Sequence, residues 1–482
     1  MRPNVLWIQS DEHRPDSLGC YGSAWARTPN LDALASRGTV FLNAVCQSPV
    51  CVPSRASQLA ARYPQEINTL FNDVCEASLS TEGRADEKIL PAGTVLFPEW
   101  AAAGADYQTA TFGKSHLPPC SPWQTEHLVV NNEDYAGYYA LNPKFEEDQF
   151  HVLKRPGSAP IIIGGTYPGG SDNPSRRITD EAIAWLSDER DESRPFLLRV
   201  SHNWPHTPVL APEPFDLLYE STALPVRYFD EHAYQTRARW DRGVADNHRM
   251  RELSPEQMQQ QWVAYMGLCA YVDHEVGRLL GSLEGCGLAE ETIVVFSADH
   301  GKGLGEWGAT EKGFFDSEVW RVPFIWSWPG RVPEGLRRAE PCELIDTART
   351  LAGLMGIDPV SHWRGRDLFG GGEEPGEVFG QIGWPSAEVP FRTNGRGAHW
   401  DCMRVAVRTA RFRLDETWME GGARLTPEDA DGNLFDLEQD PLERTNRWSD
   451  PSYGPVVAEL RERLERWWQS LDRPVRTFPA AS

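Results

Sequence analysis

The sequence predicts a doubly wound α/β fold with a largely parallel sheet, followed by a smaller α+β domain. Three observations carry this prediction: short unbroken apolar runs, helical patterns between them, and a change of pattern near residue 374. Unbroken apolar runs of four to six residues are typical of strands covered on both faces, as in a parallel sheet. Strands that alternate with helices along the chain indicate a doubly wound arrangement.

Each apolar run ends directly before polar or charged residues. The runs and the residues after them are 5–8 with Asp11 and Glu12, 109–112 with Lys114 and His116, 195–200 with His202 and His206, and 292–296 with Asp299 and His300. In open α/β sheets the ligand site forms beyond the carboxyl ends of the strands. The sequence therefore predicts that these polar side chains share one site.

Two helices between the strands have clear signals. Thr28 is predicted as the N-cap of the first, because a proline follows it in the first turn. Residues 255–284 give a longer helical pattern with an apolar face. Segments 118–180 and 207–255 are rich in aromatics, prolines and charges but lack periodicity, so we expect long loops over the site there.

The chain changes character after the stretch 364–378, which is rich in glycine, glutamate and proline. We predict a catalytic α/β domain over residues 1–374 and a smaller domain over residues 375–482. The second contains an amphipathic helical pattern over about 455–468 and four strand-like pieces, at 379–382, 403–409, 412–414 and 433–437. A small antiparallel sheet with one helix is the expected arrangement.

Composition excludes some classes of partner. The formal net charge of −23 argues against a nucleic-acid or anionic membrane surface, since both need a basic footprint. No apolar run approaches the roughly 20 residues of a membrane helix, and the run 5–8 is shorter than a signal-peptide core, so we expect a cytoplasmic protein. The nine scattered cysteines then predict reduced thiols.

The stretch CVPSRASQLAAR places a cysteine at the start of a predicted helix. Cys51 lies two residues before Pro53, which suits the first turn of a helix that runs to about Arg62. A helix N-terminus stabilises negative charge through its free N–H groups and its dipole, and Arg55 is one turn further on. The plain alternative is a buried structural cysteine before an ordinary helix.

Two further sets of residues suggest chemistry at the predicted strand ends. Three carboxylates and an imidazole can hold a hard or borderline divalent cation, and these are Asp11, Glu12, Asp299 and His300. A positive cluster in an acidic chain would be formed by Lys114, His116, His206, Lys312 and Arg55. A metal ion, a helix N-terminus and several cations together make a site for a tetrahedral oxyanion.

Some of these residues also match the signature motif of a known family. The sequence resembles the type I sulfatases of the alkaline phosphatase superfamily, whose motif C-x-P-S-R usually continues to L-T-G-R; here Ala60-Ala61 replaces the Thr-Gly pair. Other matching pieces run in the family's order from residue 4 to about 443. They are NVLWIQSDE, TPNLDALASRG, TATFGKSHL, HNWPHTP, VVFSADHG, EKGFFDSEVWRVPF and GNLFDLEQDPLE. The resemblance implies an alkaline phosphatase-like sheet and a sulfuric ester hydrolase.

The resemblance implies that a formylglycine-generating enzyme oxidises Cys51 to formylglycine, whose aldehyde is hydrated to a diol. One hydroxyl would attack the sulfur of a sulfate ester, and the second would then lose its proton and expel sulfate. A serine or an unmodified cysteine could form the ester but has no second hydroxyl for that elimination.

The resemblance also implies residue roles. Asp11, Asp299, His300 and residue 51 would bind the metal ion, with Glu12 as a further ligand where the family has Asp or Gln. Arg55 and Lys114 would hold the diol, His116 would hydrogen-bond it, and His206 and Lys312 would bind the sulfate oxygens and assist the leaving group. Ca²⁺ is the favoured ion, with Mn²⁺ and Mg²⁺ as alternatives. The Asp-His pair at 299–300 is similar to the form in choline sulfatases and phosphonate monoester hydrolases.

Three functional hypotheses follow. The first is hydrolysis of a small-molecule sulfate ester; the second is hydrolysis of a phosphonate monoester or phosphodiester on the same scaffold; the third is an inactive scaffold with an unmodified Cys51. The candidates for the walls of a substrate pocket are Asn72, Asp73, residues 135–150, loops 207–255, and Trp384, His399 and Trp400. A homo-oligomer is left open.

Overall fold

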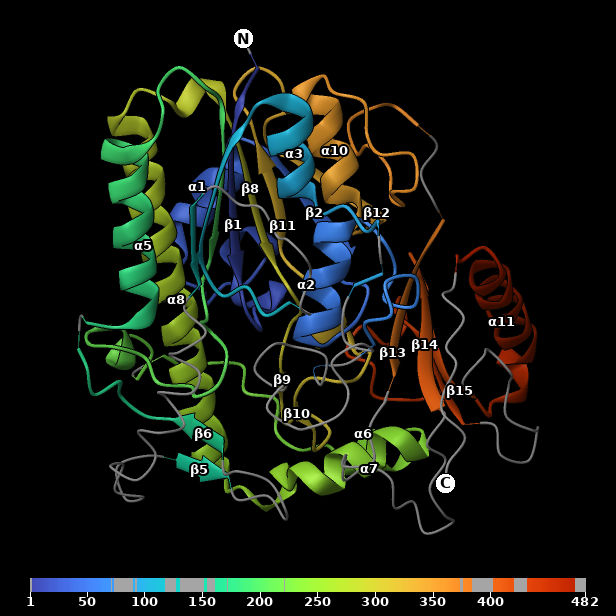
Figure 1. The fold of residues 1–482 in the computed structure, drawn as a ribbon. Helices are drawn as coiled ribbons and strands as arrows, with labels where there is room; N and C mark the ends of the chain where they lie inside the picture. Colours follow the sequence, from blue (N-terminus) through green and yellow to red (C-terminus); the bar gives the residue numbers. More distant parts are fainter. Residues whose placement is uncertain are drawn as a thin grey trace, which may run out of the picture.

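The structure is a computed structural model of the 482-residue chain. It describes residues 2–70, 72, 90–91, 93–117, 127–130, 151–153, 161–170, 172–220, 222–372, 376–383, 402–419 and 431–472. An α/β sandwich occupies most of the chain, and a smaller sheet with one helix packs at its side (Figure 1). The predicted fold class is thereby confirmed.

The main sheet has eight strands in the order β12-β2-β11-β8-β1-β7-β3-β4. Of these, β11 is antiparallel to both its neighbours and the other described pairings are parallel. The strands are β1 (Asn4–Ser10), β2 (Thr39–Val45), β3 (Gln108–Gly113), β4 (His127–Val130), β7 (Phe196–Ser201), β8 (Thr292–Ala298), β11 (Phe324–Ser327) and β12 (Leu336–Glu343). The four predicted strands correspond to β1, β3, β7 and β8.

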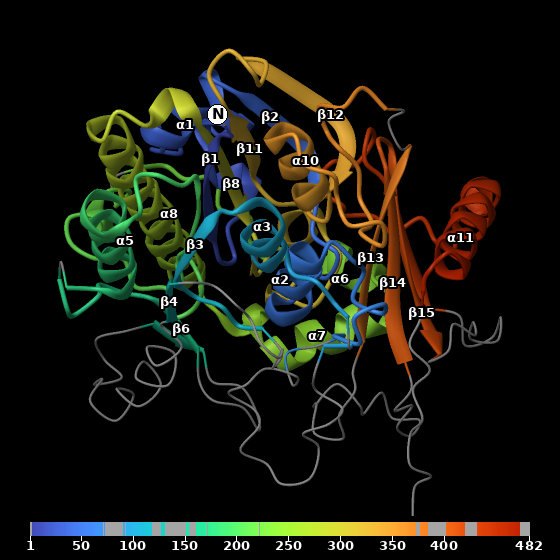
Figure 2. The ribbon, with the colours of Figure 1, turned by 45° about the horizontal axis from the view of Figure 1, so that its top comes forward.

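Helices cover both faces of this sheet (Figures 1 and 2). On one face lie α2 (Cys51–Ala60), α3 (Phe97–Ala105) and α10 (Asp346–Met355), and on the other α1 (Pro29–Ser36), α5 (Pro174–Ala184) and α8 (Pro255–Gly285). Each face of the sheet has its own hydrophobic core, and alternate residues of β1 pack into the two cores. Val5 and Trp7 pack into the first, and Leu6 and Ile8 pack into the second. An unbroken apolar run is required because neither face of β1 meets water.

The N-terminus of α1 is capped from another helix rather than by its own Thr28. Thr28 occupies the predicted N-cap position but makes no side-chain cap hydrogen bond. The carboxylate of Asp273 on α8 instead accepts hydrogen bonds from the backbone N–H groups of Asn30 (3.2 Å) and Leu31 (2.7 Å). This contact joins residues 243 positions apart, so the local cap pattern at Thr28 gave no sign of it.

Helix α2 begins at Cys51 and ends where the chain turns left-handed. The C-cap residue, Ala61, has φ +49°, and its carbonyl accepts a hydrogen bond of 2.7 Å from the N–H of Arg364. A non-glycine residue in this conformation costs roughly 1–2 kcal/mol, since its Cβ crowds the backbone. The departure from the family's glycine at this position therefore has a structural cost at the helix end.

Ala61→Gly is expected to raise the free energy of unfolding by about 1 kcal/mol, because glycine adopts the left-handed conformation without that cost. Urea unfolding of the parent and the variant measures the difference. As a matched control, Ala60→Gly, inside the last turn of α2, is expected to lower the free energy of unfolding by a similar amount. Destabilisation by Ala61→Gly would contradict the assignment of strain to this position.

Two segments predicted as loops contain regular structure, so that prediction is wrong in part. The first holds the short strands β5 (His151–Leu153) and β6 (Ile161–Gly164), and helix α5 begins near its end. The second holds α6 (Glu231–Thr236) and α7 (Arg239–His248). The buried face of α7 has helical spacing but includes two polar residues, Asp241 and His248. The sequence therefore lacked the apolar periodicity that indicates a helix. In the fold, the Asp241 carboxylate accepts a hydrogen bond from the side-chain amide of Asn433 (2.6 Å).

The second sheet is antiparallel, as predicted; its strand order is β13-β14-β15-β16, and helix α11 (Gly454–Gln469) lies on its outer face (Figure 2). Its strands are β13 (Glu377–Gly383), β14 (Cys402–Thr409), β15 (Phe412–Met419) and β16 (Gly432–Asp436). The predicted division between residues 374 and 375 lies outside the described residues. No helix in the described ranges is long and apolar enough to span a membrane.

A buried carboxyl group joins the two sheets. Glu343, at the end of β12, accepts hydrogen bonds from the Tyr63 hydroxyl (2.9 and 3.0 Å) and from the N–H of Phe379 on β13 (3.0 Å). Phe379 stacks on Trp467 of α11 at 5.1 Å. Burial, together with the nearby carboxylate of Asp346, raises the pKa of Glu343 from 4.5 to about 8.

Stability is expected to fall as pH rises from about 5 to about 8, because folded Glu343 retains a proton that the unfolded chain has already released. Glu343→Gln keeps a neutral side chain of the same size and should flatten this slope. Urea unfolding at a series of pH values measures it. An unchanged slope in the variant would contradict a protonated Glu343 at the joint between the sheets.

Candidate active site

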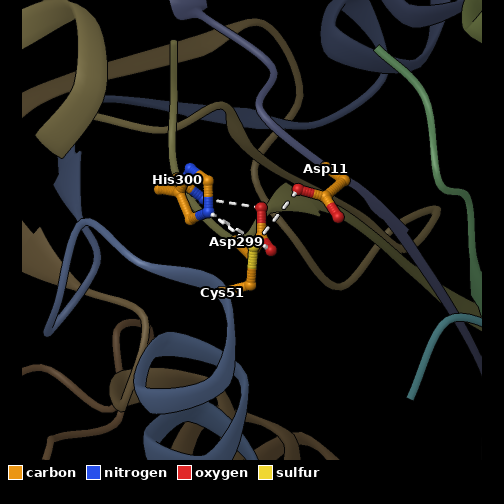
Figure 3. A group of neighbouring side chains, drawn as sticks. All are labelled: Asp11, Cys51, Asp299 and His300. Carbon is orange, nitrogen blue, oxygen red and sulfur yellow. Dashed lines mark hydrogen bonds and ion pairs between the residues drawn. The ribbon is translucent and has the colours of Figure 1, made fainter. Parts of the chain in front are cut away.

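The carboxyl ends of the parallel strands bring the predicted site residues together. Asp11 follows β1, Lys114 follows β3, His206 lies in the loop after β7, and Asp299 and His300 follow β8. Cys51 is the first residue of α2, which points its N-terminus at this edge (Figure 3). Lys312 comes directly after the short strand β10 (Thr310–Glu311), which pairs with β9 (Gly303–Leu304).

Four of the predicted metal ligands form one buried group. Asp11, Cys51, Asp299 and His300 each offer a ligand atom within 4.8 Å of the others (Figure 3). The sulfur of Cys51 lies 3.2 Å from His300 Nε2 and 3.8 Å from Asp11 Oδ1. Two carboxylates, an imidazole and a fourth donor at position 51 suit a divalent cation.

Cys51 is surrounded by positive groups. Lys312 Nζ lies 2.9 Å from its sulfur, and Lys114 Nζ lies 3.8 Å away. Burial alone would raise the pKa of the thiol, but Lys114, Lys312, His300 and a hydrogen bond from His116 hold that pKa well below its usual range. Position 51 is therefore built to carry negative charge, which agrees with its place at the N-terminus of α2.

Arg55 contacts the acidic residues of the group and lies one turn behind Cys51. Its Nε donates to Asp299 Oδ2 at 2.8 Å, and its Nη2 lies 3.3 Å from Asp11 Oδ2. It also donates to Ser201 Oγ at 2.8 Å. Arg55 thus fixes the two carboxylates, whereas Lys114 contacts both Asp11 and Cys51.

Glu12 lies outside the group of four and faces the cations. Its Oε1 accepts a hydrogen bond from Lys312 Nζ at 2.6 Å and lies 3.3 Å from His206 Nε2, and its Oε2 accepts one from Lys302 Nζ at 2.5 Å. His206 Nε2 is also 2.9 Å from Lys312 Nζ. Asp11, Glu12 and His206 do form a second set of neighbouring ligand atoms.

Sequence reasoning missed Lys302 and its partner Glu311. The Lys302 ammonium is buried and donates to Glu12, to Glu311 Oε1 (2.7 Å) and to Thr207 Oγ1 (2.9 Å). The available signal was its position in the run DHGK, three residues after Asp299, at a strand end already assigned to the site.

Few of the predicted pocket walls can be placed. The side chain of Asn72 accepts a hydrogen bond from the N–H of Val52 at 2.9 Å, so it touches the first turn of α2. Segment 207–255 contributes Thr207 to the Lys302 contacts, and α6 and α7 lie further along it. The other candidates lie outside the described residues, namely Asp73, residues 135–150, Trp384, His399 and Trp400.

Comparisons with known proteins show which proteins this chain is similar to. The family model described as Sulfatase matches residues 3–357. The N-acetylglucosamine-6-O-sulfatase of Bacteroides thetaiotaomicron is 25% identical over 96% of this chain and 86% of its own length, and the iduronate 2-sulfatase of Homo sapiens is 28% identical over 95% and 93%. The phosphonate monoester hydrolase SpPMH of Silicibacter pomeroyi shares the fold, with a TM-score of 0.76 at 22% identity over 98% of this chain and 96% of that one.

The mostly parallel sheet, with acids and cations gathered at its carboxyl edge, has the fold that SpPMH shares. The family model covers residues 3–357, well over half of the chain, so the chain belongs to the sulfatase family of hydrolases.

Proposed function

We propose that the chain hydrolyses a small-molecule sulfate ester, alkyl or aryl, to an alcohol and inorganic sulfate, using a formylglycine at position 51 and a divalent metal ion. The observation that carries this proposal is the setting of Cys51. It is buried at a helix N-terminus, has Lys312 at 2.9 Å, and lies among Asp11, Asp299 and His300. The proposed catalytic domain covers 1–374 and the smaller domain 375–482.

The metal ion would be held by Asp11, Asp299, His300 and residue 51. The donor set fits, because the four ligand atoms lie within 4.8 Å of one another and all four residues are buried. A bound Ca²⁺, Mn²⁺ or Mg²⁺ would supply a Lewis acid for the attacking oxygen and the ester. Arg55 keeps the Asp299 and Asp11 carboxylates in place through contacts of 2.8 and 3.3 Å.

Residue 51 would be converted by a formylglycine-generating enzyme during maturation. The hydrated aldehyde supplies two hydroxyls on one carbon, one for attack on sulfur and one for the release of sulfate. His116, which hydrogen-bonds the Cys51 side chain, is placed to take a proton there, since burial and Lys114 lower its pKa from 6.5 to about 4 and keep it neutral.

The sulfate oxygens would meet Lys312 and His206. The Lys312 Nζ and His206 Nε2 atoms are 2.9 Å apart, so both lie within reach of one tetrahedral anion. Either can also stabilise the charge that develops on the departing oxygen.

A phosphonate monoester or phosphodiester is the second candidate substrate. The shared fold with SpPMH and the His300 imidazole, which follows Asp299 directly, favour this alternative. The same cations would stabilise either anionic transition state. Turnover of nitrophenyl sulfate and nitrophenyl phenylphosphonate, which share a leaving group, separates the two: the proposal expects a higher kcat/KM for the sulfate, and a large preference for the phosphonate would contradict it.

Removal of the metal ion is expected to abolish turnover of nitrophenyl sulfate. The protein is dialysed against EDTA, assayed, and assayed again after addition of CaCl2 or MnCl2, with MgCl2 in parallel. Activity should return with at least one of these ions, because the Asp11, Asp299 and His300 side chains are placed to bind it. Full activity in the chelated protein would contradict the metal-dependent mechanism.

A further inference from the structure

We propose that Lys302 is a positioning residue: it holds the Glu12 carboxylate against Lys312 and His206, so that Glu12 orients these two side chains instead of binding the metal ion. The inference rests on the proposed function, which assigns Lys312 and His206 to the sulfate oxygens. It departs from the ligand role that the family resemblance implies for Glu12.

Both oxygens of Glu12 are already engaged. Oε1 meets Lys312 Nζ at 2.6 Å and His206 Nε2 at 3.3 Å, and Oε2 meets Lys302 Nζ at 2.5 Å. A carboxylate that accepts charge-assisted hydrogen bonds from two ammonium groups, one on each oxygen, gains little by leaving them for a further ion. The four ligand atoms of the proposed metal site come together without it.

The main chain of Glu12 is held separately from its side chain. Its N–H donates to Asp299 Oδ1 (3.2 Å), and its carbonyl accepts a hydrogen bond from the Tyr265 hydroxyl (2.7 Å). The residue has φ +59°, a left-handed conformation that costs about 1–2 kcal/mol outside glycine. Such strain persists where the surroundings fix it, and here the hydrogen bonds to Asp299 and Tyr265 hold the main chain.

The burial of Lys302 makes its contact with Glu12 necessary. Its side chain is 1% exposed, and a buried ammonium is tolerated only when paired and hydrogen-bonded. Its three donors are used on Glu12, Glu311 and Thr207. Lys302 therefore links two carboxylates, and neither can move toward another cation without leaving the ammonium short of a partner.

Charge accounting supports the same assignment. Asp11 and Asp299 are paired with Arg55, and Asp11 also with Lys114, while Glu12 and Glu311 share Lys302. The charge of Glu12 is thus balanced by Lys302, separately from the pairing of Asp11 and Asp299 with Arg55. Lys312 Nζ contacts Glu12, Cys51 and His206, which fixes the ammonium beside position 51.

Titration of the metal-free full-length protein with CaCl2, and in parallel with MnCl2, tests the inference without turnover. Glu12→Gln is expected to bind the ion within about threefold of the parent, whereas Asp299→Asn, the control at a proposed ligand, loses at least tenfold. Lys302→Met is expected to bind several-fold tighter, because the freed Glu12 carboxylate adds negative charge near the ion. A merely structural lysine would not increase metal affinity.

Steady-state kinetics with nitrophenyl sulfate supply the second readout. Glu12→Gln should raise KM roughly tenfold through misplaced Lys312 and His206 while its metal affinity stays unchanged. The inference would be overturned if Glu12→Gln lost as much metal affinity as Asp299→Asn. It would also be overturned if a folded Lys302→Met variant had the metal affinity and the KM of the parent. If Lys302→Met does not fold, the isosteric Glu12→Gln decides alone. A parent protein that binds neither ion contradicts the proposed function itself.

Discussion

Replacing Cys51 with alanine is expected to lower turnover of nitrophenyl sulfate by roughly four orders of magnitude or more. The variant removes the proposed nucleophile while leaving Asp11, Asp299, His300 and the surrounding cations in place. The thiol is fully buried and alanine is smaller, so the fold should be retained. Turnover is measured with the protein saturated with metal, beside the parent.

Cys51→Ser sharpens this result. A serine provides one hydroxyl, which can accept the sulfuryl group but cannot expel it again, so at most one turnover per active site is expected. Rapid quench followed by mass analysis of the residue-51 peptide would detect the trapped ester. Sustained multiple turnover by either variant would contradict the assignment of residue 51 as nucleophile.

Lys312→Met is expected to lower kcat for nitrophenyl sulfate by about 10²–10³, because it removes the cation nearest to position 51. Lys312 Nζ lies 2.9 Å from the Cys51 sulfur and 2.9 Å from His206 Nε2, so the methionine removes a polar partner from each. The ion affinity should change little, since the proposed ligand that Lys312 contacts is position 51.

Arg37→Gln is the matched control for loss of one positive charge. Arg37 lies after α1, is about half exposed, and pairs with the equally exposed Glu284. Such exposed pairs contribute little, so kinetics and stability should stay near those of the parent. An equal loss of kcat in the two variants would show that overall charge, and not the position of Lys312, controls the reaction.

The main sheet could be predicted because its strands are covered on both faces. Neither side of β1 or β8 meets water, so each strand needs an unbroken apolar run, and such runs are visible in one sequence. Contacts between distant segments left no such mark. The capping of α1 by Asp273 and the burial of Asp241 on α7 depend on partners far along the chain.

The same distinction applies to the site. Residues directly after predicted strands could be grouped, because the carboxyl ends of parallel strands converge, and Asp11, Lys114 and Asp299 do lie together. The partners of Glu12 could not be derived that way. Its carboxylate contacts Lys302, whose buried ammonium is satisfied only in the folded protein.

The central claim is that Cys51 is encoded as cysteine and works as formylglycine. Tryptic peptide 38–55 tests it directly, because it contains both Cys46 and Cys51 and ends at Arg55. Active protein is denatured, alkylated with iodoacetamide and digested. The account predicts a peptide with one label, on Cys46, and an aldehyde at position 51 that reacts with a hydrazide probe. Two alkylated cysteines in fully active protein would contradict it.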